Sequence, residues 1–410
     1  SIEISLEGVM TFARRLAEKV KEKMDAETDP GRKAVLEQML NNCQRVPFYP
    51  AETFYQAVQS AWTVKTAVEL AHPVNLHCFG RMDQILYPYY KKDLEQGRIT
   101  RDEARELLEE LLLKIMSQNI RPESNILSNF YQRYLGSSPV TIGGLRPDGK
   151  DGTNELTFLF LEAAARSKPV TNIALRVHKD MPDEVLLTAA NVLYSGTSNL
   201  ALFYDDANIE SMKRRGFESR DSINYAVMGC VEMLCPGKTG GMSANALLLS
   251  RLLDITLRNG DSRTLMGTVR GVGLKTGIPD SFTSFDQLLD AFVAQGQYMI
   301  KKIVDASNLR DSIYAERLPA PYISAFIDGC LEKKRDVTQG GGKYDLSGIS
   351  FINSIANVVD SLYVIKKLIF EEKRFTFKQL LEAIDQNFVG HEDILRLIQK
   401  VEGKWGNGNP

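Results

Sequence analysis

Between residues 139 and 216, short β-prone runs alternate with longer amphipathic runs, and this alternation limits the possible folds more than any other feature. Three strand-like runs each precede a helix-like run: PVTIGG with TNELTFLFLEAAARS, VTNIALRVH with DEVLLTAANVLYSG, and LALFYDD with NIESMKRRG. Strand, loop and helix repeated in this way are typical of parallel α/β construction. No low-complexity stretch or linker interrupts the chain, so we expect one continuous α/β domain over residues 1–410.

Helices are predicted on both sides of this region. Apolar residues recur every three or four positions from Leu6 to Met24, and residues 51–71 carry a similar stripe. Two capping boxes, each a Thr followed three residues later by Glu or Gln, predict further helices, the first of which runs to about Gln118. These boxes are Thr100 with Glu103 and Thr376 with Gln379.

Two other segments receive different predictions. Residues 71–90 contain Pro, Gly and several aromatic side chains, which indicates a strand and a loop. Residues 244–258 are predicted to form a helix that ends at Asn259–Gly260.

The composition excludes several classes of function. The formal net charge of −2 over 410 residues gives no reason to expect binding to nucleic acids or to a membrane surface. No apolar run approaches the roughly 18 residues of a membrane span. The five cysteines are odd in number and scattered, which argues against a disulfide framework and favours a reducing, cytoplasmic compartment.

The most informative motif is Gly229-Cys230-Val231-Glu232, which is followed by MLCPGKTGGMSA. The preceding residues YAVM are apolar and β-prone, so we expect Cys230 at the end of a buried strand where the chain turns into a loop. In an extended chain, residues two apart point to the same side. Cys230 and Glu232 are therefore predicted to face one cavity together, with Val231 packed away from it.

Other interpretations of this motif remain open to different degrees. A buried structural cysteine beside a solvated glutamate is the commonest arrangement for an arbitrary cysteine. A thiolate nucleophile would favour a histidine nearby in sequence, and none lies between His178 and His391. A metal site from Cys230 and Cys235 fits poorly because no second cysteine pair exists. A phosphate loop at Pro236–Thr239 lacks its first glycine, since Glu232 stands in that place.

The motif resembles the active-site loop of glycyl radical enzymes, in particular their glycerol-dehydratase-like and choline-lyase-like branch. Four further blocks resemble segments of that family in the same order, so the resemblance covers essentially the whole chain. They are residues 79–104 (FGRMDQ…), 141–157 (TIGGLRPDGKDGTNELT), 174–184 (ALRVHKDMPDE) and 339–373 (QGGGKYDLSGISF…).

The resemblance implies a fold and a chemistry. The expected fold is a ten-stranded α/β barrel of two five-stranded parallel halves surrounded by helices, and this chain would be its central part, incomplete at both ends. Cys230 would form a thiyl radical that abstracts hydrogen from a small hydroxylated substrate. Glu232 would remove the hydroxyl proton while water, an amine or sulfite leaves. A buried carboxylate suits such acid/base work, and a closed barrel protects a radical from water.

The family's radical glycine lies in an Arg-x-x-Gly-Tyr motif, which this sequence does not contain. We therefore expect the C-terminal glycine-radical domain to be absent from the chain, which would be a fragment or one part of a split enzyme. No cofactor is expected within the chain itself. The resemblance implies a radical S-adenosylmethionine activating enzyme, a small-molecule substrate and a homodimer as partners.

Two alternatives to the lyase stay in view. A pyruvate formate-lyase-like acyltransferase is disfavoured because that enzyme uses two adjacent cysteines, whereas Val231 follows Cys230. A non-catalytic fragment is motivated by the missing radical motif.

Departures from the branch bear on the substrate. Where diol-type members carry His-Ser, this chain aligns Asn75-Leu76, and where they carry Trp-His-Asp it has Met242-Ser243-Ala244. Polyol hydroxyls left unpaired would cost about 1–3 kcal/mol each, so glycerol is a poor candidate.

Several polar side chains are candidates for the substrate pocket or for structural roles. Asn75, His77 and Ser243 are the substrate-binding candidates, although a structural role fits Asn75 and His77 equally well, and Ser243 is most simply a helix N-cap. His72, His178 and His391 have no motif support. For three further residues, Tyr204, Asp205 and Asp206, loop capping is the favoured role.

Overall fold

The computed structural model describes residues 1–71, 78–117, 139–168, 171–197, 199–229, 231–406 and 408. Within these residues the chain divides into two compact units. The first unit comprises residues 1–242 and 311–346, and the second comprises residues 243–310 and 347–410. Each unit is described by itself.

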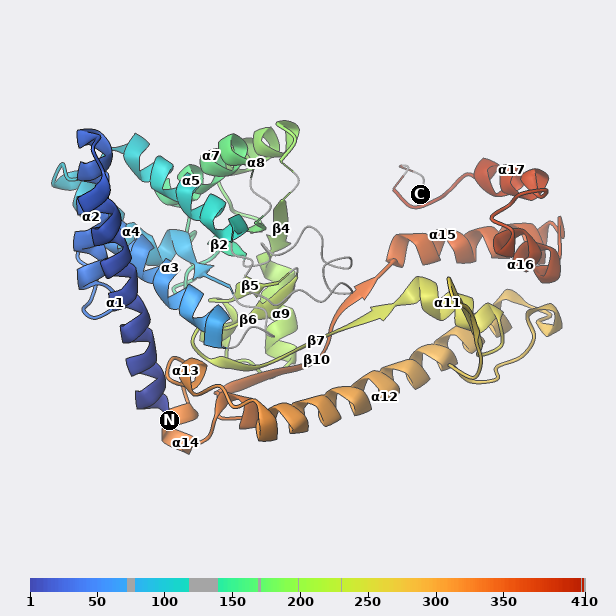
Figure 1. Ribbon diagram of the computed structural model, residues 1–410. Helices are drawn as coiled ribbons and strands as arrows, with labels where there is room; N and C mark the ends of the chain where they lie inside the picture. Colours follow the sequence, from blue (N-terminus) through green and yellow to red (C-terminus); the bar gives the residue numbers. More distant parts are fainter. Residues whose placement is uncertain are drawn as a thin grey trace. The chain divides into compact units, whose positions relative to one another are not determined.

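A four-stranded parallel sheet forms the centre of the first unit (Figure 1). Its strands follow chain order: β1 (Gly80–Arg81), β2 (Val140–Gly143), β3 (Ile173–Val177) and β4 (Leu200–Tyr204). The predicted parallel α/β construction is confirmed. The other strands of the described residues form two-stranded sheets.

Helices between and around these strands build the main core of the first unit. Helix α7 (Glu155–Ser167) packs against α5 (Arg101–Ser117) and α8 (Asp183–Tyr194), and α9 (Asp205–Arg214) follows β4. Apolar side chains of the strands and of α5 and α7 are buried together because each element presents one apolar face. The core includes Leu108, Leu112, Val140, Ile142, Leu159, Phe160, Ile173 and Leu175.

The remaining elements of the first unit include the predicted N-terminal helices. The remaining elements are α1 (Ile2–Ala26), α2 (Pro30–Arg45), α3 (Phe54–Ala71), α4 (Met82–Glu95), α10 (Ser219–Ser222), β5 (Ala226–Met228), β6 (Glu232–Leu234), α13 (Pro321–Ser324), α14 (Cys330–Lys333) and the short 3-10 turn Val337–Gln339. Strands β7 (Thr239–Leu248) and β10 (Tyr344–Asn353) pair with each other, and only their residues 239–242 and 344–346 belong to the first unit.

The capping box at α5 is confirmed. The Thr100 amide donates to the Glu103 carboxylate at 2.7 Å, and the Glu103 amide donates to Thr100 Oγ1 at 3.2 Å. This reciprocal pair satisfies two donors that the first turn of a helix leaves without intrahelical partners. The helix begins at Arg101, as the sequence predicted, and is described up to Ser117.

The loop predicted up to residue 90 is partly wrong, because α4 occupies Met82–Glu95. Met82, Leu86 and Tyr90 recur every four residues and are all buried, so they form an apolar stripe that packs a helix on the core. Pro88 lies inside this helix on its exposed side, where water can bind the carbonyl that the proline cannot pair.

The second unit is mainly helical. It contains α11 (Leu249–Leu257), residues 285–310 of α12 (Phe285–Arg317), α15 (Ile355–Ile365), a π-helical turn (Lys366–Glu371), α16 (Phe377–Asp385) and α17 (Glu392–Lys400). It also contains the hairpin of β8 (Ser262–Thr264) and β9 (Gly267–Val269) and the 3-10 turn Pro279–Ser281. The Thr376–Gln379 capping box at the start of α16 is confirmed by both of its hydrogen bonds.

The helix predicted over residues 244–258 begins later than expected. Residues 239–248 form strand β7, whose backbone groups are paired with β10, and the helix starts at Leu249 with Leu248 as its N-cap. The prediction that Ser243 caps this helix is therefore wrong, since its backbone lies within β7. The predicted end is confirmed by the left-handed conformations of Asn259 and Gly260.

No helix in the described part of the chain is long and apolar enough to span a membrane. The cysteines that the structure describes, Cys43, Cys78, Cys235 and Cys330, are free thiols.

The Gly143–Gly144 turn after β2 allows a close approach that a side chain would prevent. Gly144 has φ +76°, and a Cβ there would lie 2.6 Å from the side chain of Arg176. We expect Gly144→Ala to destabilise the protein by about 1–3 kcal/mol more than Gly149→Ala, because overpacking adds to the cost of the left-handed backbone. Gly149 has φ +80° with open space around it, so it is the matched control. Melting temperatures of the two purified variants provide the measurement, and equal losses would contradict the contact.

Candidate active site

The predicted active-site motif lies on a β-hairpin. Strands β5 and β6 pair antiparallel, with Ala226 opposite Leu234 and Met228 opposite Glu232. The chain reverses after β5, where Gly229 adopts φ +60°. Glu232 therefore begins the return strand. The turn after the buried strand agrees with the sequence prediction, whereas the return strand right after it was not predicted. That Cys230 and Glu232 face one cavity stays a prediction.

Glu232 is buried at this hairpin. Glu232 is 3% exposed, whereas the adjacent Val231 is 44% exposed. The Val231 amide donates to Glu232 Oε2 at 3.0 Å. That Val231 packs away from a cavity shared by Cys230 and Glu232 stays a prediction. A buried carboxylate at a chain reversal is a suitable proton acceptor for a substrate that reaches it.

The other predicted site residues are placed only in part. Cys230, Asn75 and His77 lie outside the described residues. Ser243 is located by its backbone in β7, and its side chain is outside the described part. Of the five predicted site residues, Glu232 alone has a described side chain.

A buried ion pair holds the segment that leads into the hairpin. Arg176 of β3 donates to both carboxylate oxygens of Asp205, at 2.8 Å each. Its remaining donors bind the carbonyl oxygens of Ile223 and Tyr225, both at 2.9 Å. The guanidinium also lies over the Tyr225 ring, 3.9 Å from its centroid. One arginine thus fixes two carbonyls and one ring immediately before β5.

Asp205 joins this ion pair to two further groups. It accepts hydrogen bonds from the Leu145 amide at 2.7 Å and from the Tyr225 hydroxyl at 2.8 Å. The bond to Leu145 agrees with the predicted loop-capping role, while the ion pair to Arg176 was not foreseen. Burial, together with the neighbouring Asp205 charge, raises the pKa of Tyr225 despite the nearby Arg176 cation, so the phenol stays a donor to Asp205.

Arg81 of the Gly-Arg-Met-Asp-Gln block is a second buried arginine at the same sheet. It donates to the carbonyl oxygens of Gly143 at 2.8 Å and Leu145 at 2.9 Å, and to Asn224 Oδ1 at 3.0 Å. Burial, reinforced by the charge of Arg176, lowers the pKa of Arg81 to about 10, which still leaves it charged at neutral pH.

Asp83 completes the structural role of this block. Its Oδ2 accepts from the Gly143 amide and from Thr157 Oγ1, each at 2.7 Å. Burial raises the pKa of Asp83. The block therefore fixes β1, the turn after β2 and the start of α7. Arg81 and Asp83 do this by bonding to other residues of the protein, so we assign them a structural role rather than ligand binding.

The segment that leaves the hairpin is held by a second cluster of charges. The Asp221 carboxylate accepts from Lys238 Nζ at 2.5 Å, from Lys343 Nζ at 2.8 Å and from the Tyr344 hydroxyl at 2.7 Å. Burial acts to raise the pKa of Asp221, but the hydrogen bonds from these three donors outweigh it and hold the pKa well below its usual range. Lys238 of the Pro-Gly-Lys-Thr loop is thus engaged by a carboxylate, in keeping with the argument against a phosphate loop.

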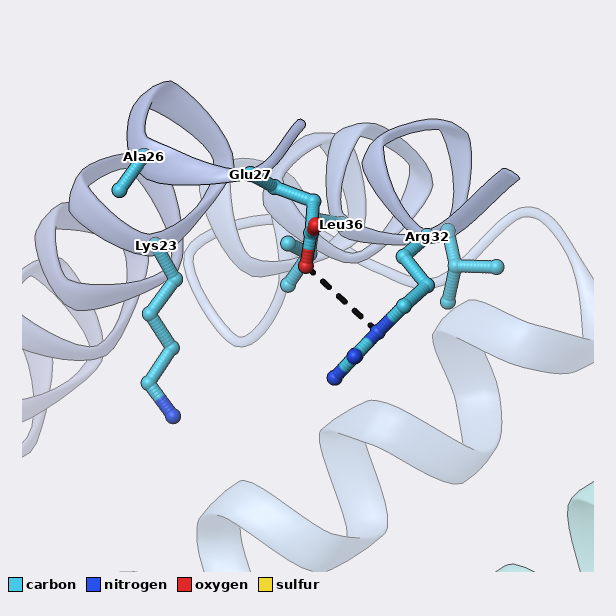
Figure 2. A pocket seen from close by; sticks show the side chains of 6 residues that line it. Lys23, Ala26, Glu27, Arg32 and Leu36 are labelled. Atoms are coloured by element: carbon cyan, nitrogen blue, oxygen red, sulfur yellow. Dashed lines mark ion pairs between the residues drawn. The ribbon is translucent and has the colours of Figure 1, made fainter. Parts of the chain in front are cut away.

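Two surface hollows lie on the α1–α2 helix pair and contain no residue of the hairpin. One, of about 500 Å³, is lined by Lys23, Glu27 and Arg32 among others, and Figure 2 shows the ion pair of Glu27 Oε2 with Arg32 Nε at 3.5 Å. The other, of about 570 Å³, includes Arg14 and Tyr49. Neither brings predicted catalytic residues together.

Comparison with known proteins decides the family. The pyruvate formate lyase-like family model matches residues 1–410, which includes both units. The chain belongs to the pyruvate formate lyase-like family. The sequence-based resemblance to glycyl radical enzymes is confirmed, because the relatives and solved structures that match the chain belong to that group.

Three relatives illustrate the similarity. The chain is 31% identical to trans-4-hydroxy-L-proline dehydratase of Clostridioides difficile over 411 residues, which covers 99% of this chain and 51% of that protein. It is 31% identical to (2S)-3-sulfopropanediol dehydratase of Klebsiella oxytoca, covering 98% and 49%. The glycerol-bound B12-independent glycerol dehydratase from Clostridium butyricum superposes with a TM-score of 0.86 at 31% identity, covering 98% and 50%. The chain thus spans about half the length of the relatives it matches.

Sequence reasoning missed Arg176, Arg81 and Asp221 as supports of the pyruvate formate lyase-like hairpin. One signal was present for Arg176, because an arginine in the middle of the apolar run VTNIALRVH must find a partner when it is buried. An acidic residue at the end of the following strand, Asp205, is a natural partner in a parallel sheet. No local signal connects Asp221 with Lys343, since more than a hundred residues separate them.

We expect Arg176→Met to destabilise the protein by about 3–5 kcal/mol, because it leaves the Asp205 carboxylate buried without its cation. Arg214→Met is the matched control, since the pair of Arg214 with Glu210 is exposed to solvent. The control should change stability by less than about 0.5 kcal/mol. Thermal unfolding of both variants tests this, and similar losses would refute the importance of the buried pair.

Proposed function

We propose that the protein containing this chain is a glycyl radical lyase of the dehydratase type. Residues 1–410 would be the central part of its catalytic barrel domain, with the glycine-radical domain outside them. The observation that carries the proposal is the motif Gly229–Glu232, with Glu232 buried on a hairpin that charged contacts hold at both ends. The names of the relatives, which include dehydratases and a sulfite-lyase, support an elimination reaction.

In the proposed reaction, Cys230 and Glu232 divide the work. The glycine radical supplies the oxidising equivalent that converts the Cys230 thiol to a thiyl radical. Cys230 then takes a hydrogen atom from the substrate carbon that bears the hydroxyl. Glu232 accepts the hydroxyl proton, and the group on the neighbouring carbon leaves with its bonding electrons. The hydrogen atom returns from Cys230 to the product radical, so the thiyl radical is regenerated.

The proposed substrate is a small hydroxylated molecule that loses water, an amine or sulfite. Relatives named for hydroxyproline, sulfopropanediol and isethionate offer a test panel. Asn75-Leu76 and Met242-Ser243-Ala244 stand where diol-type members carry other polar groups, which argues for a substrate less polar than glycerol or of another shape. Asn75, His77 and Ser243 are the proposed substrate-binding residues.

The proposed partners follow from the same chemistry. A radical S-adenosylmethionine activating enzyme would generate the glycine radical, and the protein would act as a homodimer in the cytoplasm. An Arg-x-x-Gly-Tyr motif in the same reading frame after Pro410 would separate this proposal from a non-catalytic fragment. Formate release from pyruvate in the presence of coenzyme A would favour the acyltransferase instead.

We expect Cys230→Ser in the full-length protein to abolish turnover while the glycine radical still forms. An O–H bond is stronger than an S–H bond, so serine cannot form the hydrogen-abstracting radical. Anaerobic activation followed by electron paramagnetic resonance measures the radical, and the substrate panel measures turnover. Absence of a glycyl doublet in the wild-type protein would contradict the proposal, as would a Cys230→Ser variant that still turns over.

We expect Glu232→Gln to slow elimination by about 10²–10⁴-fold, since a positioned acid/base group contributes about that much. The amide keeps the size of the side chain but cannot accept the hydroxyl proton. Glu218→Gln is a suitable control, because Glu218 is an exposed carboxylate that pairs with Lys343. Steady-state rates normalised to radical content provide the measurement, and a wild-type rate in Glu232→Gln would show that another group takes the proton.

A further inference from the structure

We propose that Asp221 is a positioning residue of the reaction proposed above: it joins the two ends of the β5–β6 hairpin to the strand β10 and so sets where Cys230 and Glu232 stand. This inference rests on the proposed function. It concerns the base of the hairpin, where Asp221 and Lys238 lie, whereas the proposed function concerns Cys230 and Glu232, at and near its tip.

Asp221 closes the hairpin on itself. It lies in α10, five residues before β5 begins, and Lys238 lies four residues after β6 ends. The Asp221 carboxylate accepts from Lys238 Nζ at 2.5 Å, and its main-chain carbonyl accepts from the Cys235 thiol at 3.0 Å. Residues 221–238 thus form a loop whose two ends are bonded to each other, and this loop carries Cys230 and Glu232.

The same carboxylate fastens the loop to a distant part of the first unit. Its other oxygen, Oδ2, accepts from Lys343 Nζ at 2.8 Å and from the Tyr344 hydroxyl at 2.7 Å. The backbone continues this connection, since the Tyr344 amide donates to the Lys238 carbonyl at 3.0 Å. The Tyr344 ring packs against Phe217, with centroids 4.4 Å apart. The hairpin base is therefore bonded to the start of β10 through both side chains and backbone.

Only a carboxylate satisfies this arrangement. Asp221 is 4% exposed, and three donors, two of them cationic, converge on its two oxygens. An amide of the same size would present a donor to one side of the cluster, would leave the Lys238 ammonium without this counter-charge, and would leave Lys343 with the exposed Glu218 carboxylate alone. The cluster would then separate, and the hairpin would lose the bond between its ends.

Movement of the hairpin base matters because hydrogen-atom transfer requires close, defined distances. A misplacement of about 1 Å can slow a reaction about 100-fold. Residues near the tip inherit any shift of the base, because the hairpin is short and every residue of its strands, Ala226–Met228 and Glu232–Leu234, is paired across the hairpin. Asp221 itself touches neither substrate nor radical in this scheme.

Solvent exchange of the glycine radical measures this positioning without any substrate. The Cys230 thiol hydrogen exchanges with deuterium in D2O. If the thiol gives that deuterium to the glycine radical and later takes back the original hydrogen, deuterium replaces the hydrogen on the glycine α-carbon. The doublet caused by that hydrogen then collapses to a singlet. The collapse rate per radical reports the geometry between Cys230 and the glycine.

We expect Asp221→Asn in the activated full-length protein to slow this collapse about 10–100-fold while the radical yield stays within about twofold of wild type. Lys238→Met should also slow it, by about tenfold. Lys238→Met keeps Asp221 bonded to Lys343 and Tyr344, so it serves if Asp221→Asn fails to fold. Glu218→Gln is the control, because Glu218 pairs with Lys343 at 2.9 Å through an exposed side chain. It should collapse at the wild-type rate.

The outcomes separate the two proposals. A wild-type collapse rate in Lys238→Met and in folded Asp221→Asn overturns the positioning role, as does equal slowing in Glu218→Gln. A lower melting temperature or radical yield with an unchanged collapse rate per radical indicates a purely structural residue and also overturns it. A wild-type doublet that never collapses, or no doublet at all, contradicts hydrogen transfer between Cys230 and glycine, and the proposed function fails together with this inference.

Discussion

The rest of the first unit depends on the buried ion pair of Arg176 and Asp205. Burying two charges costs several kcal/mol for each ion, and the pair is tolerated only when its remaining donors and acceptors are also satisfied. Here Arg176 binds two carbonyls beside its carboxylate, and Asp205 accepts from an amide and a phenol. The ion pair therefore links β3, the start of α9, the turn after β2 and the segment before β5 in one network.

The family-like sequence blocks acquire a physical explanation from this network. Gly144 has no side chain because the guanidinium of Arg176 fills the space where a Cβ would lie. Arg81 and Asp83 fix the same turn from the neighbouring strand, through the carbonyl and the amide of Gly143 respectively. These glycine, arginine and aspartate positions thus specify the sheet and the path into the hairpin, while the chemistry is assigned to other residues.

Elements with local signals were predicted from the sequence, and elements that depend on distant partners were not. The capping boxes at Thr100 and Thr376 and the alternating runs of the parallel sheet carry their information within a few residues, and all are confirmed. Residues 244–248 have apolar, helix-compatible composition, but pairing with β10 makes them a strand. Burial of Met82, Leu86 and Tyr90 likewise outweighed the loop signal of Pro88.

The candidate site shows the same division. Glu232 was identified because it stands two residues from Cys230 in a distinctive motif, whereas Asp221 has no distinctive neighbours and depends on Lys343 and Tyr344 from far along the chain. The polar anchors lie at the hairpin base and within the sheet, so they do not require particular side chains around the tip. Residues that face a substrate can therefore change without weakening these supports.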